Sequence, residues 1–422
     1  MYKRSTLENG LTIITNKMPY SNSVSVAFLI GTGSCYESQG EEGISHFIEH
    51  MCFKGTVQRP TAMHITREIE GVGGILNAST DKETTIFWSK AASKHFPLII
   101  EVLSDLLLNS QYSAEELEKE RRVIIEEINM NMDLPQQRVT MLIDKLLWPG
   151  QVLGKEIAGN KASVSSITRD QLLSYTSRRY VPNNTVVSIA GNIHHEQVVA
   201  QLNLLLETWQ PKDSSMNYIS DDVQTSPRLS IENRVGEQTH ICLAVHGFSY
   251  YHPQRFTLGL LNTVLGGGMS SRLFTEIRER QGLAYDIGSY VEHSLNSGSL
   301  VVYAGIDPNN TRVTTESILD QLSSLKQGIT SNELHRAQEL LKGRLELRLE
   351  DSKNMALWLG SQELLTHRIL EINDVINIID AITIVDLEQV ANNLLSSDGI
   401  SLAIVGPSGH EPSIDYLKSR VI

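Results

Sequence analysis

The stretch GISHFIEHMCFKG, residues 43–55, carries the pattern on which the interpretation of the first half of the chain rests. Its apolar residues recur at helical spacing between two bounding glycines, which predicts a short helix with a cap from Ser45 or Glu42. Residues four apart on a helix lie nearly above one another, so His46 and His50 project to the same side. Their separation suits a single Zn²⁺ ion, while the apolar side chains take the opposite side.

Glu49 lies three residues after His46, which places its carboxylate beside the predicted metal face. A carboxylate there can take a proton from a zinc-bound water and later return it to a leaving amine, while the metal polarises a scissile carbonyl. Glu49 is therefore a candidate general base. The alternative is that His46 and His50 form a core pair satisfied by backbone hydrogen bonds, as isolated histidines usually are.

A catalytic zinc needs three protein ligands and one open position, so a third side chain is required. The helical segment 114–130 offers Glu127. At about 100° per residue, Glu127 and Glu120 fall along the edge of an apolar stripe, whereas Glu126 points nearly the opposite way. A carboxylate on the buried side of a helix is costly unless it is paired or coordinated. Salt bridges with basic residues of the same helix are the alternative explanation.

An internal repeat connects the two halves of the chain. Ile167, before a helical segment, and Gly191, after an apolar run, recur 215 positions later as Ile382 and Gly406. Other matches keep the same order at slightly different offsets, as insertions would produce. The pattern predicts a duplicated unit of roughly 200 residues.

The repeat divides the chain into two homologous domains: a zinc-binding catalytic domain at 1–212, a polar linker at 213–228 and a second domain at 229–422. Where the first domain has its metal helix, the second has the apolar segment 261–265. The counterpart of the third ligand lies near Arg344. We therefore expect the second domain to be metal-free and to form the opposing wall of the site.

The fold class follows from how strand and helix patterns alternate. Their mixture predicts an α+β fold in which each domain has a mixed, mostly antiparallel sheet flanked by helices. The runs that carry this prediction are strand-like at 24–30, 84–88 and 186–190, and helical at 94–108, 114–130 and 169–179.

Composition narrows the function classes. The 422 residues exceed what one hydrophobic core usually organises, and 41% hydrophobic with 20% charged residues is ordinary for a globular protein. A formal net charge of −13 argues against a nucleic-acid partner and mildly favours a basic substrate. A solvated acidic surface is the alternative reading of this charge.

The three cysteines, Cys35, Cys52 and Cys242, match neither a disulfide framework nor a metal motif, which favours a reducing compartment. The N-terminus lacks an apolar signal core, and no run approaches the roughly 18 apolar residues of a membrane span. We expect a soluble, cytoplasmic protein without membrane contact, and unconventional secretion stays open.

The metal pattern resembles that of a known family. Residues 51–126 intervene between His50 and Glu127, and His-x-x-Glu-His followed after 76 residues by a ligand glutamate is typical of the pitrilysin, insulin-degrading enzyme and mitochondrial processing peptidase family of M16 zinc metallopeptidases. The resemblance covers nearly the whole chain and is closest to short, two-domain bacterial members. It implies a LuxS/MPP-like metallohydrolase fold, zinc ligands His46, His50 and Glu127, and catalytic support from Glu120.

Two further stretches resemble the family. Asn77 and Ala78 lie in an Asn-Ala-x-Thr segment to which substrate is added as an extra strand, an ordinary turn being the alternative. Arg278 and Tyr285, spaced by seven, resemble a pair that acts in substrate binding and catalysis. Arg278 would hold a substrate carbonyl and Tyr285 would donate to the oxyanion. The alternative is an exposed arginine and a core tyrosine.

The resemblance implies a zinc endopeptidase with one Zn²⁺ per chain that cleaves peptides or unfolded polypeptide segments inside a clamshell chamber. Two chains would form that chamber, so we expect a homodimer. The alternative is a catalytically idle peptide-binding or processing-complex subunit, although such members typically lose the metal motif. A purely structural zinc protein is less consistent with Glu49 and an open fourth position. The sequence does not determine the cleavage-site preference. It also leaves open whether Arg278 and Tyr285 act at the zinc site of their own chain or at that of a partner chain.

Overall fold

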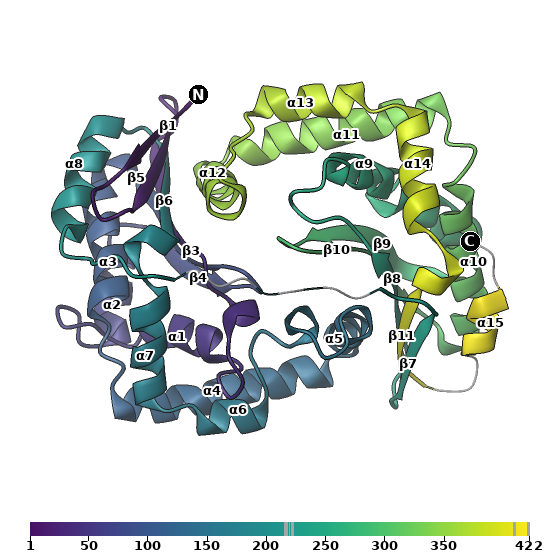
Figure 1. The fold of residues 1–422 in the computed structure, drawn as a ribbon, viewed down its shortest axis with the longest axis horizontal. Helices are drawn as coiled ribbons and strands as arrows, with labels where there is room; N and C mark the ends of the chain where they lie inside the picture. Colours follow the sequence, from purple (N-terminus) through teal and green to yellow (C-terminus); the bar gives the residue numbers. More distant parts are fainter. Residues whose placement is uncertain (215–217, 219, 221–222, 408–410, 420–422) are drawn as a thin grey trace. The chain divides into compact units, whose positions relative to one another are not determined.

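Two β-sheets with helices packed against them form the computed structural model of the protein (Figure 1). The structure describes residues 1–214, 218, 220, 223–407 and 411–419. As far as they are described, the residues form two compact units, the first within Met1–Ile128, Glu156–Tyr218 and Glu346–Glu371, the second within Asn129–Lys155, Ile219–Leu345 and Ile372–Ile422. Each unit therefore includes a segment from the other half of the sequence.

The first unit contains a six-stranded sheet in the order β1-β2-β6-β3-β5-β4. Strands β2 and β6 pair in parallel, and the other neighbours are antiparallel. The central strands β3 and β6 are buried almost throughout, whereas the edge strand β4 alternates between exposed and half-buried residues. The strands are β1 (Tyr2–Thr6), β2 (Thr12–Lys17), β3 (Ser23–Ile30), β4 (Ile75–Thr80), β5 (Thr85–Ala92) and β6 (Thr185–Gly191).

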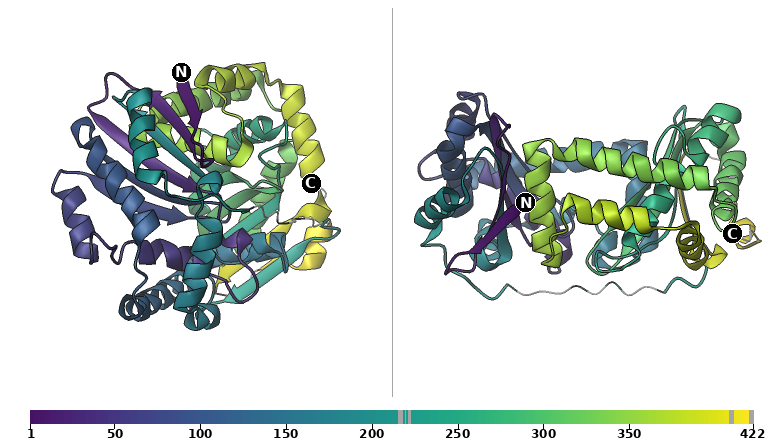
Figure 2. Two further views of the ribbon diagram at one scale, coloured as in Figure 1. Left: turned by 60° about the vertical axis from the view of Figure 1, so that its left-hand side comes forward. Right: turned by 90° about the horizontal axis from the view of Figure 1, so that it is seen from above.

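Helices α3 (Phe96–Asn109) and α12 (Ser352–Thr366) pack on opposite faces of this sheet (Figures 1 and 2). Helix α12 contacts β2, β3 and β6, although it lies far from them in sequence. Gly360 permits this contact, because a Cβ atom there would lie 2.8 Å from the Cβ of Ser188. The first sheet is thus completed by a helix from the C-terminal half of the chain.

The remaining helices of the first half include the two that carry the predicted metal ligands. Helix α7 begins with a capping box, in which Thr168 and Gln171 each accept a backbone N–H from the other. The helices are α1 (Ile44–Cys52), α2 (Ala62–Glu70), α4 (Ala114–Asp133), α6 (Lys161–Ser166), α7 (Arg169–Arg179) and α8 (His195–Leu206).

The second unit has a five-stranded sheet in the order β7-β11-β8-β10-β9. Strands β7 and β11 pair in parallel and the others are antiparallel, which repeats the β2-β6-β3-β5-β4 arrangement. The predicted α+β fold with mixed, mostly antiparallel sheets is therefore confirmed. The strands are β7 (Arg228–Asn233), β8 (Thr239–His246), β9 (Ala284–His293), β10 (Gly298–Ile306) and β11 (Ser401–Gly406).

Helix α5 (Pro135–Leu147) packs on β11 and β8, although it belongs to the N-terminal half of the sequence. On the β9 side, α9 (Arg255–Gly266) contacts both the sheet and α14 (Ile384–Leu394). The other helical segments are the π-helix η5 (Phe274–Arg280), α10 (Thr311–Ser324), α11 (Ser331–Leu349), α13 (Ile372–Ala381) and α15 (Ile414–Ser419).

The repeated sequence positions occupy equivalent places in the two sheets. Gly191 ends β6 and Gly406 ends β11, with φ values of 147° and 158° that favour glycine. Thr383 starts α14 with a capping box to Asp386, as Thr168 does in α7. The repeat therefore corresponds to a repeated structural element.

None of the described helices has the length and apolarity needed to cross a membrane. In the predicted linker 213–228, residues 215–217, 219 and 221–222 lie outside the described residues. Strand β7 begins at the last residue of that range, Arg228.

Candidate metal centre

Helix α1 presents two imidazoles on one side and buries the other side. His46 is buried and His50 is half-buried, and their Nε2 atoms lie 3.2 Å apart. The core-facing side chains are fully buried, namely those of Ile44, Phe47, Ile48 and Met51. Burial of this apolar face fixes the direction in which the histidines point.

The start of α1 is capped by Glu37. Its carboxylate accepts the backbone N–H groups of Gly43, at 2.8 Å, and Ser45, at 2.9 Å. The predicted cap by Ser45 or Glu42 is wrong, because the Ser45 hydroxyl bonds to Tyr175 and Glu42 accepts from a preceding loop amide. Burial raises the pKa of Glu37 to about 7, and the two backbone hydrogen bonds partly oppose that rise.

Glu127 of α4 completes a cluster of three possible ligand atoms. Its carboxylate oxygens lie 3.7 Å from His46 Nε2 and 3.6 Å from His50 Nε2. Ligands about 2.0–2.1 Å from a tetrahedral zinc lie about 3.4 Å from one another, so the observed spacings fit such an ion. Within the described part of the chain, these three residues are the one group of His, Cys, Asp or Glu close enough to hold a metal.

The protonation state of His46 also suits metal binding. Burial lowers its pKa to about 4, so the imidazole is neutral at physiological pH. Its Nδ1 atom is buried and has no hydrogen-bond partner among the described residues. A neutral imidazole with a proton on Nδ1 leaves the Nε2 lone pair available for a cation.

Glu120 lies behind the cluster, where its Oε1 is 2.8 Å from His50 Nδ1 and its Oε2 is 2.6 Å from Lys54 Nζ. Burial opposes its ionisation, but these two partners outweigh the effect and lower its pKa. The carboxylate thus accepts from Nδ1 and leaves His50 Nε2 free to face Glu127. Its partners come from α1 and the turn after it, not from basic residues of α4.

Glu49 is held by the edge strand of the first sheet. The Thr80 hydroxyl, at the end of β4, donates to Glu49 Oε2 at 2.6 Å. Burial raises the pKa of Glu49, and the hydrogen bond from Thr80 opposes that rise. The residue is also close enough to His50 and Glu127 for their charges to influence it.

Asn77 and Ala78 lie within β4, opposite Trp88 and Phe87 of β5, and not in a turn. Strand β4 ends the order of the described strands, so its other edge has no strand partner there. Helix α1 contacts the same strand. The cluster is therefore next to a sheet edge with backbone groups available for pairing.

Arg278 and Tyr285 lie together in the second unit, on η5 and β9. The guanidinium carbon of Arg278 is 5.2 Å from the centre of the Tyr285 ring and 4.8 Å from that of Phe274. Tyr285 is 78% exposed, so the alternative of a core tyrosine is wrong. The structure places this pair in a different compact unit from the metal cluster.

Three neighbours of the cluster were not predicted from sequence. Lys54 follows His50 by four residues, so the argument from helical spacing could have found it. Thr80 ends the Asn-Ala-x-Thr segment, whereas Glu37 carries no local signal.

Comparisons with known proteins identify a family and several relatives. The family description "Insulinase (Peptidase family M16)" matches residues 12–161, and "Peptidase M16 inactive domain" matches 166–341. An uncharacterized zinc protease of Bacillus subtilis is 35% identical over 414 residues, covering 98% of this chain and 100% of that protein. One from Mycobacterium tuberculosis is also 35% identical, over 98% of this chain and 94% of that protein.

Solved structures share the fold at lower identity. A protease from Helicobacter pylori superimposes with a TM-score of 0.92 at 21% identity, covering 96% of this chain and 99% of that one. A peptidase M16 inactive domain from Pseudomonas fluorescens has a TM-score of 0.90 at 17% sequence identity, covering 98% of this chain and 99% of that one. A chain of complex III from Candida albicans has a TM-score of 0.87 at 18% sequence identity, covering 99% of this chain and 98% of that one.

Curated relatives that match nearly the whole chain are named zinc proteases. Identity of 35% along almost its full length shows that the chain is a two-domain member of peptidase family M16.

Proposed function

We propose that this protein is a zinc-dependent endopeptidase that cleaves peptides or unfolded polypeptide segments. His46, His50 and Glu127 would hold one zinc ion per chain, which would supply Lewis acidity to the attacking water and the scissile carbonyl. The supporting observation is the convergence of three ligand atoms at 3.2–3.7 Å from one another. A half-buried carboxylate, Glu49, lies beside them.

Glu49 is the proposed general base. It would accept a proton from the attacking water and deliver it to the leaving nitrogen. Burial raises its pKa toward neutrality, where a group that must both take and release a proton works best. Thr80 orients the carboxylate, and Glu120 would act as a positioning residue that fixes the ring of His50.

Substrate would add to the free edge of β4, with Asn77 and Ala78 as pairing residues. Backbone pairing gives affinity with little demand on side chains. Arg278 would hold a substrate carbonyl, and the exposed hydroxyl of Tyr285 would donate to the oxyanion of its own or a partner chain's site. The proposal includes a cytoplasmic homodimer, for which light scattering on purified protein measures the oligomeric state.

Digestion of a peptide library, followed by mass spectrometry, tests the activity. The zinc-loaded protein should cleave, a chelator should stop cleavage, and added zinc should restore it. Glu49→Gln should retain a full equivalent of zinc and lose about 10²–10⁴-fold in kcat, the usual contribution of a general base. Near-normal turnover by this variant would contradict the role of Glu49 as the general base.

An idle peptide-binding subunit is the second candidate, because one protein with this fold is described as an inactive domain. The same experiment separates the two candidates. A fully zinc-loaded protein that binds library peptides without cleaving any would favour the idle subunit. Chelator-sensitive cleavage favours the peptidase.

A further inference from the structure

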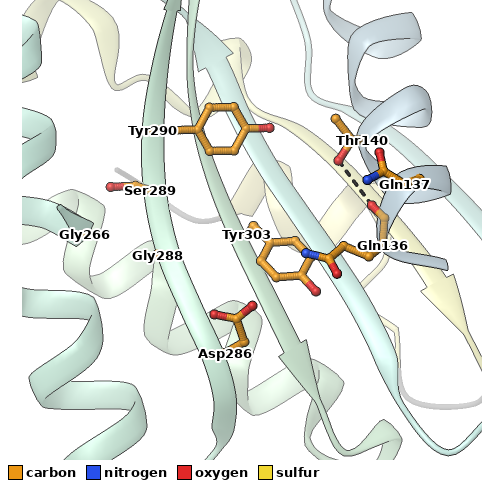
Figure 3. Close-up of a pocket in the computed structure, with 9 residues that line it drawn as sticks. All are labelled: Gln136, Gln137, Thr140, Gly266, Asp286, Gly288, Ser289, Tyr290 and Tyr303. Atoms are coloured by element: carbon orange, nitrogen blue, oxygen red, sulfur yellow. Dashed lines mark hydrogen bonds between the residues drawn. The ribbon is translucent and has the colours of Figure 1, made fainter. Parts of the chain in front are cut away.

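The second unit contains a pocket of about 320 Å³ between the first turns of α5 and the strands β9 and β10 (Figure 3). Ligand sites typically measure about 300–1,000 Å³, so this one suits a single long side chain. The residues that carry the argument are Gln136, Thr140, Asp286, Gly288, Tyr290 and Tyr303.

The pocket exists because a glycine stands where the sheet would otherwise place a side chain. Gly288 of β9 is directly opposite Tyr303 of β10. Asp286 and Tyr290 lie two residues to either side of Gly288, so they share one face of the strand. Figure 3 shows Asp286, Tyr290 and Tyr303 on the side of the strands that faces Gln136. A gap bordered by two phenol rings and one carboxylate results.

Asp286 is the one charged residue among those that line the pocket. It is exposed, and its side chain forms no hydrogen bond or ion pair with another described residue. The hydroxyl of Tyr303 is 2.9 Å from Nδ1 of His240. Burial lowers the pKa of His240, so that imidazole is uncharged at neutral pH and does not neutralise Asp286. The pocket therefore keeps a net negative charge.

The second phenol, that of Tyr290, projects toward Thr140 of α5 (Figure 3). The Thr140 hydroxyl donates to the Gln136 carbonyl oxygen at 3.2 Å. Two aromatic rings, an unpaired carboxylate and an amide oxygen are the groups that recognise a guanidinium. A carboxylate in the same space would be repelled by Asp286.

We propose that this pocket binds an arginine side chain of the peptide substrate, with Asp286 as its charged partner. The proposal rests on the peptidase function and adds a preference for basic substrates. The net charge of −13 supports it, because an acidic protein attracts basic peptides over distance. Asp286 follows Tyr285 on β9, so the two side chains project to opposite faces of that strand.

Binding to zinc-loaded Glu49→Gln protein tests the pocket without turnover. The probes are two fluorescein-labelled unstructured peptides that differ only in having one arginine or one citrulline, which has the same shape but no charge. Fluorescence anisotropy at low ionic strength should show about three- to ten-fold tighter binding of the arginine peptide. Adding Asp286→Asn should remove that preference. Equal affinities in the parent protein, or no binding of the arginine peptide, would overturn the proposal.

Two further variants separate the pocket from a general effect of charge. Glu292→Gln removes an equal charge from β9 outside the pocket, and it should leave the preference intact. Gly288→Val keeps Asp286 but fills the gap, and it should remove the preference. A Cβ at residue 288 would meet only the Gly266 carbonyl oxygen, at 3.5 Å, so the fold should tolerate the change. A preference that survives Gly288→Val would contradict the pocket.

Failure of the pocket and failure of the peptidase proposal give different results. A wild-type protein that cuts no library peptide but still prefers arginine in the binding assay would refute the enzyme and retain the pocket. A wild-type protein that cleaves peptides while its Glu49→Gln form binds both probes equally would retain the enzyme and refute the pocket.

Discussion

Helix α1 of the first unit and helix α9 of the second occupy equivalent places with different chemistry. Helix α1 contacts β4 and α7, and α9 contacts β9 and α14, which are the corresponding strand and helix. Helix α1 directs His46 and His50 toward Glu127 of α4. Helix α9 has no histidine and buries leucine residues on its core side. The same scaffold therefore exists with and without a set of metal ligands.

The helices that face α1 and α9 differ in the same way. When α4 and α11 are aligned at their first residues, Glu127 of α4 corresponds to Arg344 of α11, and Glu120 corresponds to Ala337. The Arg344 guanidinium donates to the carbonyl oxygen of Gly267, at the end of α9. A carboxylate that faces two imidazoles is thus replaced by a cation that caps a helix end. The candidate metal site therefore depends on these few side chains and not on the fold.

Removal of the carboxylate that distinguishes α4 from α11 should have the largest effect. Glu127→Ala should lower zinc affinity by more than about 100-fold, because one of three protein ligands is lost. Peptidase activity should fall with the zinc content. Metal analysis by mass spectrometry after dialysis measures the change, and Glu126→Ala, on the exposed side of α4, is the control. A full equivalent of tightly held zinc in Glu127→Ala would point to another ligand.

A change in the second unit should affect the proposed reaction without affecting the metal. Tyr285→Phe removes an exposed hydroxyl and keeps the ring that contacts Arg278. Loss of one oxyanion donor should lower kcat by about 10²-fold, with KM and zinc content nearly unchanged. Steady-state kinetics on a cleaved library peptide, combined with metal analysis, measures both. Unchanged kcat would remove Tyr285 from the proposed chemistry.

The grouping of His46, His50 and Glu127 could be predicted from sequence because helical geometry fixes relative directions over short distances. Spacings of three, four and seven residues determine which side chains of α1 and α4 share a face. Strand positions were also recovered closely: the expected run 186–190 lies within β6, Thr185–Gly191. The run 84–88 captured only the first part of β5, which extends to Ala92, because the buried positions of the second part are held by Ser89 and Ala91, which are not large apolar residues.

The exchange of helices between the halves could not be predicted in this way. An apolar helix face indicates that α5 and α12 are buried but not which sheet buries them. Gly360, whose lack of a side chain allows α12 to approach Ser188, gives no directional information in the sequence. The cap of α1 could not be predicted either. The path of the loop between Glu37 and Gly43 brings the Glu37 carboxylate to the helix start, and the sequence does not specify that path.

The smallest expected effect concerns this cap, which also distinguishes the two units. Glu37 caps α1, whereas the residue before α9, Gln254, makes no side-chain cap. Burial raises the pKa of Glu37 from 4.5 to about 7, so the folded protein binds an extra proton between these values. Stability linked to this proton is fully present below pH 4.5 and is lost as the pH rises through 7. The loss should be on the order of 1–3 kcal/mol.

Glu37→Gln should remove this pH dependence. The measurements are made with a chelator present, so that metal binding does not contribute to stability. Between pH 5 and pH 8, the melting temperature of the wild type should fall by about 2–10 °C more than that of Glu37→Gln. Scanning calorimetry at one scan rate measures both proteins, with Glu126→Gln as an exposed control that follows the wild type. Parallel pH profiles for wild type and Glu37→Gln would show that the carboxyl group at α1 is already ionised at pH 5. The cap would then act as a fixed anion at a helix N-terminus, and the difference between the units would lie in charge alone.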